Sequence, residues 1–124
     1  MIPYCQDMGV GLIPWSPLAR GAFTRPRGSR DALRENTDNR LKNTIRGRET
    51  EADRAIVNRV EEIAKRKGAS MAQVATSWSL AKGMNPIIGL NKKERIDEAC
   101  EAIKIELTEE EIKYLEEPYI PNPL

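Results

Sequence analysis

The chain has 124 residues, a formal net charge of +1, 40% hydrophobic residues and 31% charged residues. These values fit one small globular domain and exclude a disordered or fibrous chain. No apolar run approaches the ~18 residues that a membrane span requires, and the first residues do not form a signal peptide. We therefore expect a cytoplasmic protein without a membrane partner.

The histidine and cysteine content narrows the chemistry. The chain has no histidine, which removes the commonest general base and the commonest zinc ligand, and we expect no metal site. Its two cysteines, Cys5 and Cys100, lie far apart and lack the spacing of a CxxC motif. We expect both to be buried, reduced thiols, which also indicates a reducing compartment.

Positive charge is concentrated between Arg20 and Arg48. This segment contains nine of the 20 basic residues but only three of the 19 acidic ones, so its formal charge is +6 and that of the remainder is −5. A basic stretch on an acidic body predicts a bound anion. A solvated basic loop explains the same pattern equally well.

The first half of the chain carries few signals of regular structure. Residues 1–8 are typical of the end of a helix that Gly9 terminates in a left-handed conformation. The apolar run 10–13 predicts a short strand buried on both faces. Two prolines then exclude a helix over 14–17. Residues 22–49 show little apolar periodicity, and we expect a long loop there.

Four helices are predicted after this loop from capping signals and from apolar residues at helical spacing. Three of them begin at capping boxes, which start at Thr50, Ser70 and Thr108. The segment Asn91–Glu94 is expected to cap the fourth. Residues 86–90, bounded by proline and polar residues, predict a second short buried strand.

The predicted order of elements indicates an incomplete fold. Strands that alternate with helices pair in parallel through right-handed crossovers. Two parallel strands do not make a sheet, and strands this apolar require cover on both faces. The sequence therefore predicts a piece of a larger α/β fold, which we expect to self-associate or to dock on a complementary barrel fragment.

Three segments of the chain resemble a known family. These segments are Gly11–Gly21 (GLIPWSPLARG), Pro86–Ala99 (PIIGLNKKERIDEA) and Leu107–Tyr119 (LTEEEIKYLEEPY). In this order they resemble the C-terminal part of aldo-keto reductases, in the branch that includes bacterial general-stress reductases, potassium-channel β subunits and fungal secondary-metabolism reductases. The resemblance covers essentially the whole chain.

The resemblance implies a fold class and a domain. Aldo-keto reductases are α/β proteins with a (β/α)8 TIM barrel, whose active site lies at the C-terminal ends of the strands. Residues 1–124 are then a partial NADP-dependent oxidoreductase domain, with a long basic loop at 22–49. They form the C-terminal portion of the barrel, which is its last two strands and their helices. The family's catalytic Asp, Tyr, Lys and His lie on earlier strands, so no catalytic residue is expected here.

The resemblance also implies an NADP site. Trp15 stands where the family stacks an aromatic ring on the nicotinamide, and the residues after it surround the pyrophosphate. Arg95 stands where a basic residue contacts the adenosine 2′-phosphate, with Lys92 adding charge, and Glu98 stands where a carboxylate contacts the adenine. The expected cofactor-binding residues are Trp15, Ser16, Pro17, Leu18, Ala19, Gly21, Gly89, Asn91, Lys92, Arg95, Glu98 and Ala99.

Four of these residues also have a purely structural interpretation. Trp15 would then be a core tryptophan and Gly21 an ordinary turn glycine. Arg95 and Glu98 would lie on a solvated helix face.

Three functions are compatible with the sequence. The first is the C-terminal, cofactor-binding part of an NADP-dependent aldo-keto reductase whose parent reduces aldehydes or ketones by hydride transfer, with NADPH and a small carbonyl substrate as partners. The alternative is a non-catalytic truncated product that acts as a binding or regulatory module docking on a partner. A nucleic-acid binder ranks last, because only Phe23 interleaves with the arginines of the basic stretch and the net charge is close to neutral.

The isolated chain is expected to reduce no carbonyl compound with NADPH, because it lacks the family's catalytic residues. Cofactor binding alone leaves the reaction without its proton donor, a contribution worth roughly 10²–10⁴ in rate. The measurement is the oxidation of NADPH by purified full-length chain in the presence of 4-nitrobenzaldehyde. Turnover above the protein-free blank would contradict this expectation.

Overall fold

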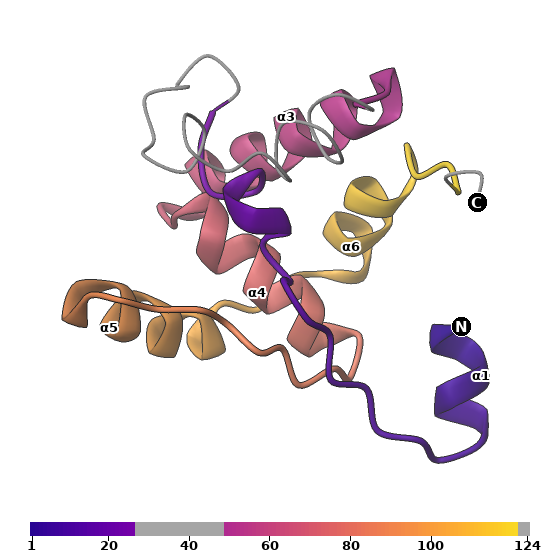
Figure 1. Ribbon diagram of the computed structural model, residues 1–124. Helices are drawn as coiled ribbons and strands as arrows, with labels where there is room; N and C mark the ends of the chain where they lie inside the picture. Colours follow the sequence, from indigo (N-terminus) through magenta and orange to yellow (C-terminus); the bar gives the residue numbers. More distant parts are fainter. Residues whose placement is uncertain (27–48, 122–124) are drawn as a thin grey trace.

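The structure is a computed structural model that describes residues 1–26 and 49–121 (Figure 1). Most of the predicted basic loop at 22–49 lies outside these residues. Among the described residues, no helix is long and apolar enough to cross a membrane. The helices and short 3-10 turns are, in chain order, α1 (Ile2–Asp7), η1 (Ala19–Gly21), α3 (Glu51–Lys67), α4 (Met71–Ala81), α5 (Lys93–Glu101), η3 (Ala102–Lys104) and α6 (Glu109–Glu116).

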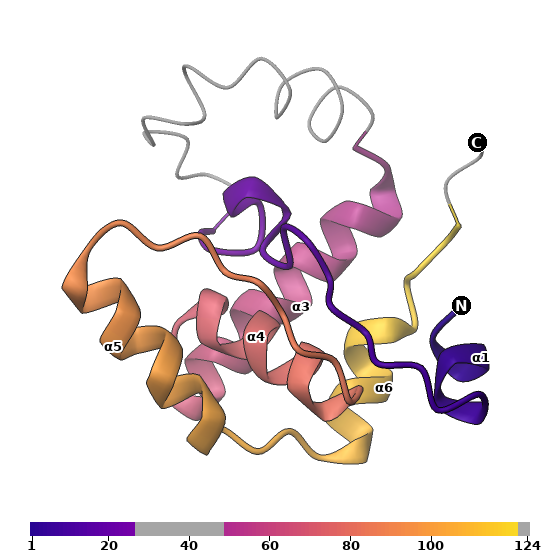
Figure 2. The same ribbon diagram turned by 60° about the horizontal axis from the view of Figure 1, so that its bottom comes forward.

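The hydrophobic core lies where α3, α4 and α6 pack together (Figures 1 and 2). Ile63 of α3 and Val74 of α4 have no exposed surface, and Leu115 of α6 belongs to the same buried cluster. Complete burial of one such side chain stabilises the fold by about 1.5–3 kcal/mol. The indole N–H of Trp78 also donates to the carboxylate of Glu116 at 2.8 Å, which ties α4 to α6 through a polar contact.

The three predicted capping boxes are confirmed. Thr50, Ser70 and Thr108 each accept a hydrogen bond from the backbone N–H three residues later, and the side chain at that later position accepts one in return. A cap of this kind contributes ~1 kcal/mol. Gly68 ends α3 in the left-handed conformation, with φ of 61°. These local signals explain why the long helices begin where the sequence predicts.

The two predicted strands, 10–13 and 86–90, are wrong as strands. In their place the described residues contain two isolated parallel bridges, which pair Leu12 with Met84 and Trp15 with Ile87 (Figure 2). The predicted parallel direction is therefore confirmed. A continuous ladder does not form, because Pro14 lies between the two bridged residues Leu12 and Trp15 and has no N–H to donate.

The predicted burial of these segments on both faces is also wrong. Alternate side chains of the pair turn toward the helices, as Met84 does, and only 8% of Met84 is exposed. The intervening side chains of Ile13, Trp15 and Ile87 are 66%, 71% and 59% exposed. We call these three residues the open apolar row; no described element covers it. Self-association through this row stays a prediction.

The N-terminal helix and the cysteines give two confirmations and one correction. Helix α1 ends before Gly9, whose φ is 65°, as the sequence predicts. The expected burial of the free thiol is confirmed for Cys5 and wrong for Cys100, which is exposed. Helix α5 covers little of the chain: Glu98 and Ala99 are its half-buried residues, and its other residues, Cys100 among them, are exposed.

A largely buried ion pair joins α3 to α6. Lys67 Nζ lies 2.9 Å from Glu111 Oε2, and the Glu111 side chain is only 15% exposed. The same carboxylate accepts a hydrogen bond from the Thr108 N–H at 3.0 Å. Burial raises the pKa of Glu111, but the hydrogen bond from Thr108 and the contact with Lys67 outweigh it and leave the pKa below its ordinary value.

This lowered pKa makes stability depend on pH in a defined direction. The contribution is fully present above the ordinary glutamate pKa of about 4.3 and is lost as pH falls through the folded-state value. Glu111→Gln, which keeps an acceptor at the cap, is expected to lower the free energy of unfolding by about 1–2 kcal/mol at pH 7 and by less at pH 3. Urea unfolding at fixed protein concentration measures both values, and exposed Glu109→Gln is the control. Equal losses of unfolding free energy at pH 7 and pH 3 would contradict a lowered pKa of Glu111.

Candidate functional site

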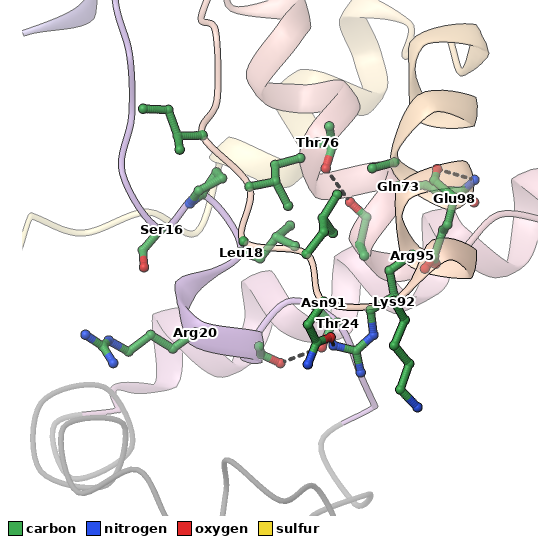
Figure 3. A pocket seen from close by; sticks show the side chains of 18 of the residues that line it. Ser16, Leu18, Arg20, Thr24, Gln73, Thr76, Asn91, Lys92, Arg95 and Glu98 are labelled. Atoms are coloured by element: carbon green, nitrogen blue, oxygen red, sulfur yellow. Dashed lines mark hydrogen bonds between the residues drawn. The ribbon is translucent and has the colours of Figure 1, made fainter.

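A cleft of about 660 Å³ lies between the loop that begins at Trp15, the start of α4 and the start of α5. Figure 3 shows how the side chains of these three elements surround it. Its lining residues are Trp15, Ser16, Pro17, Leu18, Arg20, Gly21, Thr24, Arg25, Ala72, Gln73, Thr76, Ile87, Ile88, Gly89, Leu90, Asn91, Lys92, Arg95, Glu98 and Ala99.

The structure brings together the two segments that the sequence singled out. Every expected cofactor-binding residue except Ala19 lines the cleft. Ala19 instead forms the start of the η1 turn. That these residues bind a cofactor stays a prediction.

The loop after Trp15 has a constrained backbone. Ser16, Ala19 and Arg20 have φ of 56°, 45° and 55°, which is the left-handed region that L-residues other than glycine rarely adopt. Gly21 follows with φ of 102°, a conformation that an added side chain would strain even though a Cβ there would meet no atom closer than Thr24 Oγ1 at 3.6 Å. Such strain persists where the surroundings determine it, and it is concentrated at binding sites.

Hydrogen bonds within the loop fix this shape. The Ala19 N–H donates to Ser16 O at 2.8 Å, and the Gly21 N–H donates to Leu18 O at 2.9 Å. Thr24 then donates its hydroxyl to Gly21 O at 2.9 Å (Figure 3). The loop is therefore compact, and these bonds hold its lining residues at the wall of the cleft.

Trp15 is exposed and is not the core tryptophan of the structural interpretation. Its side chain is 71% exposed, and the Arg20 guanidinium lies 5.3 Å from the ring centroid. A cation at this distance is attracted by the ring's electron density. The ring is thus available at the cleft as a stacking surface, with a basic residue beside it.

The other wall of the cleft ends at the N-terminus of α5. The predicted cap of this helix by the Asn91–Glu94 segment is wrong, because the N-cap is Lys92 and makes no side-chain capping bond. Asn91 instead accepts a hydrogen bond from Arg95 at 3.3 Å. The first amides of α5 and the positive end of its dipole therefore lie beside Lys92 and Arg95, which favours an anion at this end of the cleft.

Charge around the cleft is unequal. Among residues 1–26 and 49–121, four cationic side chains line it, those of Arg20, Arg25, Lys92 and Arg95, against the single carboxylate of Glu98. The sequence interpretation included Lys92 and Arg95 but read Arg20 and Arg25 only as members of a basic stretch. Their position at the cleft could not be inferred without knowing that the stretch begins at this wall.

Helix α4 supplies the lining residues that sequence reasoning missed. Gln73 and Thr76 lie on the side of α4 that faces the cleft (Figure 3). Thr76 donates its hydroxyl to Ala72 O within its own helix, at 2.8 Å. Both were interpreted as parts of a capped, apolar helix, and the local pattern contains no further signal for a site.

Comparison with known proteins identifies the family. A sequence profile described as "Aldo/keto reductase family" matches residues 1–120. The chain belongs to the aldo/keto reductase family. The resemblance inferred from the three sequence segments is therefore confirmed.

Individual aldo/keto reductases show how much of the family this chain represents. The chain is 59% identical to versiconal hemiacetal acetate reductase of Aspergillus parasiticus, and the match covers 100% of the chain and 36% of that protein. The structure of a thermostable aldo-keto reductase in complex with the inhibitor epalrestat matches 95% of the chain and 33% of its own chain, with 27% identity and a TM-score of 0.66. This chain thus spans about a third of the length of the relatives it matches.

A second structural likeness bears on the fold alone. The glycerol dehydrogenase of Gluconobacter oxydans matches 100% of the chain and 39% of its own chain, with 24% identity and a TM-score of 0.69. Together with the thermostable reductase, it confirms that the fold is that of the aldo/keto reductase barrels.

Proposed function

We propose that the chain is the C-terminal, NADP-binding part of an aldo/keto reductase whose complete form reduces aldehydes or ketones by hydride transfer. One observation carries this proposal. The loop after Trp15 and the start of α5, which are distant in the sequence, line one cleft with an excess of positive charge. Aldo/keto reductases generally use NAD(P)H and act on carbonyl substrates. The negative phosphates of such a cofactor agree with the positive charge of the cleft.

The residues of the cleft fit the parts of NADPH in order. Trp15 offers its exposed ring for stacking with the nicotinamide. The compact η1 loop, with Gly21 in a conformation suited to glycine, offers close backbone approach to the pyrophosphate. Arg95 and Lys92, beside the start of α5, pair with the 2′-phosphate, and Glu98 accepts a hydrogen bond from the adenine amino group. When bound, the cofactor supplies the hydride.

The proposal assigns binding and orientation to this chain and no catalytic step. Stacking on Trp15 would fix which face of the nicotinamide ring is exposed to substrate. The residues that protonate the substrate oxygen belong to the other strands of the barrel, of which we propose that residues 10–15 and 84–90 represent the last two. The predicted role of the chain as a partial domain over residues 1–124 follows from the same proposal.

The open apolar row favours a second candidate, a non-catalytic module that docks on a partner. Ile13, Trp15 and Ile87 offer an apolar surface next to the cleft. Under this candidate the row would be covered by another protein and the cleft would bind no dinucleotide. Titration with NADPH therefore separates the two functions.

Cofactor preference tests the first proposal at Arg95. NADPH is expected to bind more tightly than NADH, because only NADPH carries the 2′-phosphate. Arg95→Ala is expected to weaken NADPH binding by about 1.5–3 kcal/mol, roughly ten- to a hundred-fold, and to leave NADH binding almost unchanged. Isothermal titration calorimetry measures the four affinities.

Lys93→Ala is the matched control for this experiment. Lys93 lies on the same turn of α5 but pairs with Asp97 at 2.6 Å and does not line the cleft. It should therefore change neither affinity by more than about two-fold, as expected for an exposed ion pair. Equal affinities of NADPH and NADH for the unmodified chain would rule out the assignment of Arg95.

A further inference from the structure

Apolar burial does not explain how α5 is positioned. None of its nine residues is buried, and its residues 93–97 are exposed. Yet α5 carries Arg95 and Glu98 at the wall of the cleft. Directional contacts must therefore contribute to the position of this helix, since hydrophobic packing alone tolerates sliding and rotation.

Two hydrogen bonds from α4 supply such contacts. Gln73 donates from Nε2 to Glu98 O at 3.1 Å (Figure 3). The Ser77 hydroxyl lies 2.8 Å from Ala102 O and also 2.8 Å from Gln73 O of its own helix, so these two carbonyls share its single hydrogen. The two donors are one helical turn apart on α4, and the two acceptors are one turn apart at the end of α5 and in η3. A rotation of α5, or a shift of half a turn along its axis, would break both bonds.

Gln73 has its amide orientation fixed from the other side. Its Oε1 accepts the hydrogen bond from the Ser70 N–H at 2.9 Å, as part of the capping box of α4. Because the oxygen is committed to this cap, the NH₂ group faces Glu98 O. A flipped amide would place oxygen against oxygen on one side and N–H against N–H on the other.

The residue type at this position differs from its two equivalents. The corresponding residues in the capping boxes of α3 and α6 are Asp53 and Glu111, both carboxylates. A carboxylate caps a helix at least as well as an amide, because it also interacts favourably with the helix dipole. It cannot donate a hydrogen bond when ionised. Only the amide at Gln73 satisfies both the cap of α4 and the carbonyl of α5.

We propose that Gln73 is a positioning residue that sets the register of α5 on α4 and thereby places Arg95 and Glu98 at the 2′-phosphate and adenine end of the cleft. The identity of the nucleotide in this inference rests on the proposed function, whereas the role of Gln73 in the register of α5 does not. Ser77 makes the second contact, one turn farther from Arg95. The role of Gln73 is to orient residues that bind the nucleotide, and Gln73 itself need not touch it.

Gln73→Glu and Gln73→Met test the proposal in the 124-residue chain. Gln73→Glu keeps the acceptor for Ser70 and replaces the donor to Glu98 O by a carboxylate oxygen. At pH 7.5 we expect α5 amides to exchange with deuterium about ten-fold faster, and adenosine 2′,5′-bisphosphate to bind about ten-fold more weakly, as loss of one well-placed hydrogen bond predicts. Gln73→Met removes both polar contacts and should show the same two losses.

The pH profile separates positioning from general destabilisation. As pH falls from 7.5 to 4, which lies below the ordinary glutamate pKa of about 4.3, the introduced carboxyl group gains a proton and can again donate to Glu98 O. The loss of affinity in Gln73→Glu should therefore shrink, whereas that in Gln73→Met should not. Each variant keeps the same charged residues at the cleft, which are Arg20, Arg25, Lys92, Arg95 and Glu98. Dividing the affinity and the exchange rate of each variant by those of the unmodified chain at the same pH therefore removes the effect of these residues. Glu111→Gln, which changes the equivalent position of α6 away from the cleft, is the control for lost stability.

Each result decides one of the two proposals. Faster α5 exchange together with a pH-dependent loss of affinity in Gln73→Glu supports the positioning role. Amide exchange and bisphosphate affinity like those of the unmodified chain would overturn the positioning role. A loss of affinity equal to that of Glu111→Gln at every pH would overturn it as well. If the unmodified chain binds no bisphosphate, the proposed function fails, and the exchange of α5 amides alone decides the role of Gln73. If Gln73→Glu does not fold, the comparison rests on Gln73→Met.

Discussion

The parallel alignment of two distant segments is the constraint on which the cleft depends. The Asn85 N–H donates to Leu12 O at 2.8 Å, and the Ile87 N–H donates to Pro14 O at 3.2 Å. These two bonds bring the loop that begins at Trp15 beside the residues that lead into α5. The loop and the helix N-terminus then face one another across one space, although neither segment forms a strand. Without this alignment, the loop and the start of α5 would be separate polar surfaces.

The second wall of the cleft, the start of α5, is positioned by its contacts with α4. Helix α4 packs in the core through Val74, meets α6 through Trp78, and contacts α5 through Gln73 and Ser77. It is therefore both a core element and the floor of the cleft. The position of the cleft walls therefore depends on a helix that belongs to the core, whereas the residues proposed to bind the nucleotide lie on half-buried or exposed segments. This division agrees with the general need for binding groups to be oriented by rigid supports.

The sequence predicted well those features that local chemistry decides. Each capping box needs only residues within four positions, so the starts of α3, α4 and α6 were predictable from Thr50, Ser70 and Thr108. Strand formation and burial depend on tertiary partners. Pro14 interrupts the pairing of the two apolar segments, and no described element covers Ile13, Trp15 and Ile87, so both expectations were wrong. The proposed cofactor-binding residues of the two motifs come from family resemblance, and the structure places all of them except Ala19 at one cleft. Gln73 was missed because its second hydrogen bond is tertiary, and nothing in its own helix indicates it.

The central claim is that the loop after Trp15 and the start of α5 form one dinucleotide site. The most direct test is backbone amide NMR of ¹⁵N-labelled chain titrated with NADPH. We expect chemical-shift changes at residues 16–21 and at residues 89–98 to saturate together, with one dissociation constant for NADPH. Adenosine 2′,5′-bisphosphate should change mainly the shifts of residues 89–98. Shift changes confined to α6, or two sets that saturate at different concentrations, would contradict it.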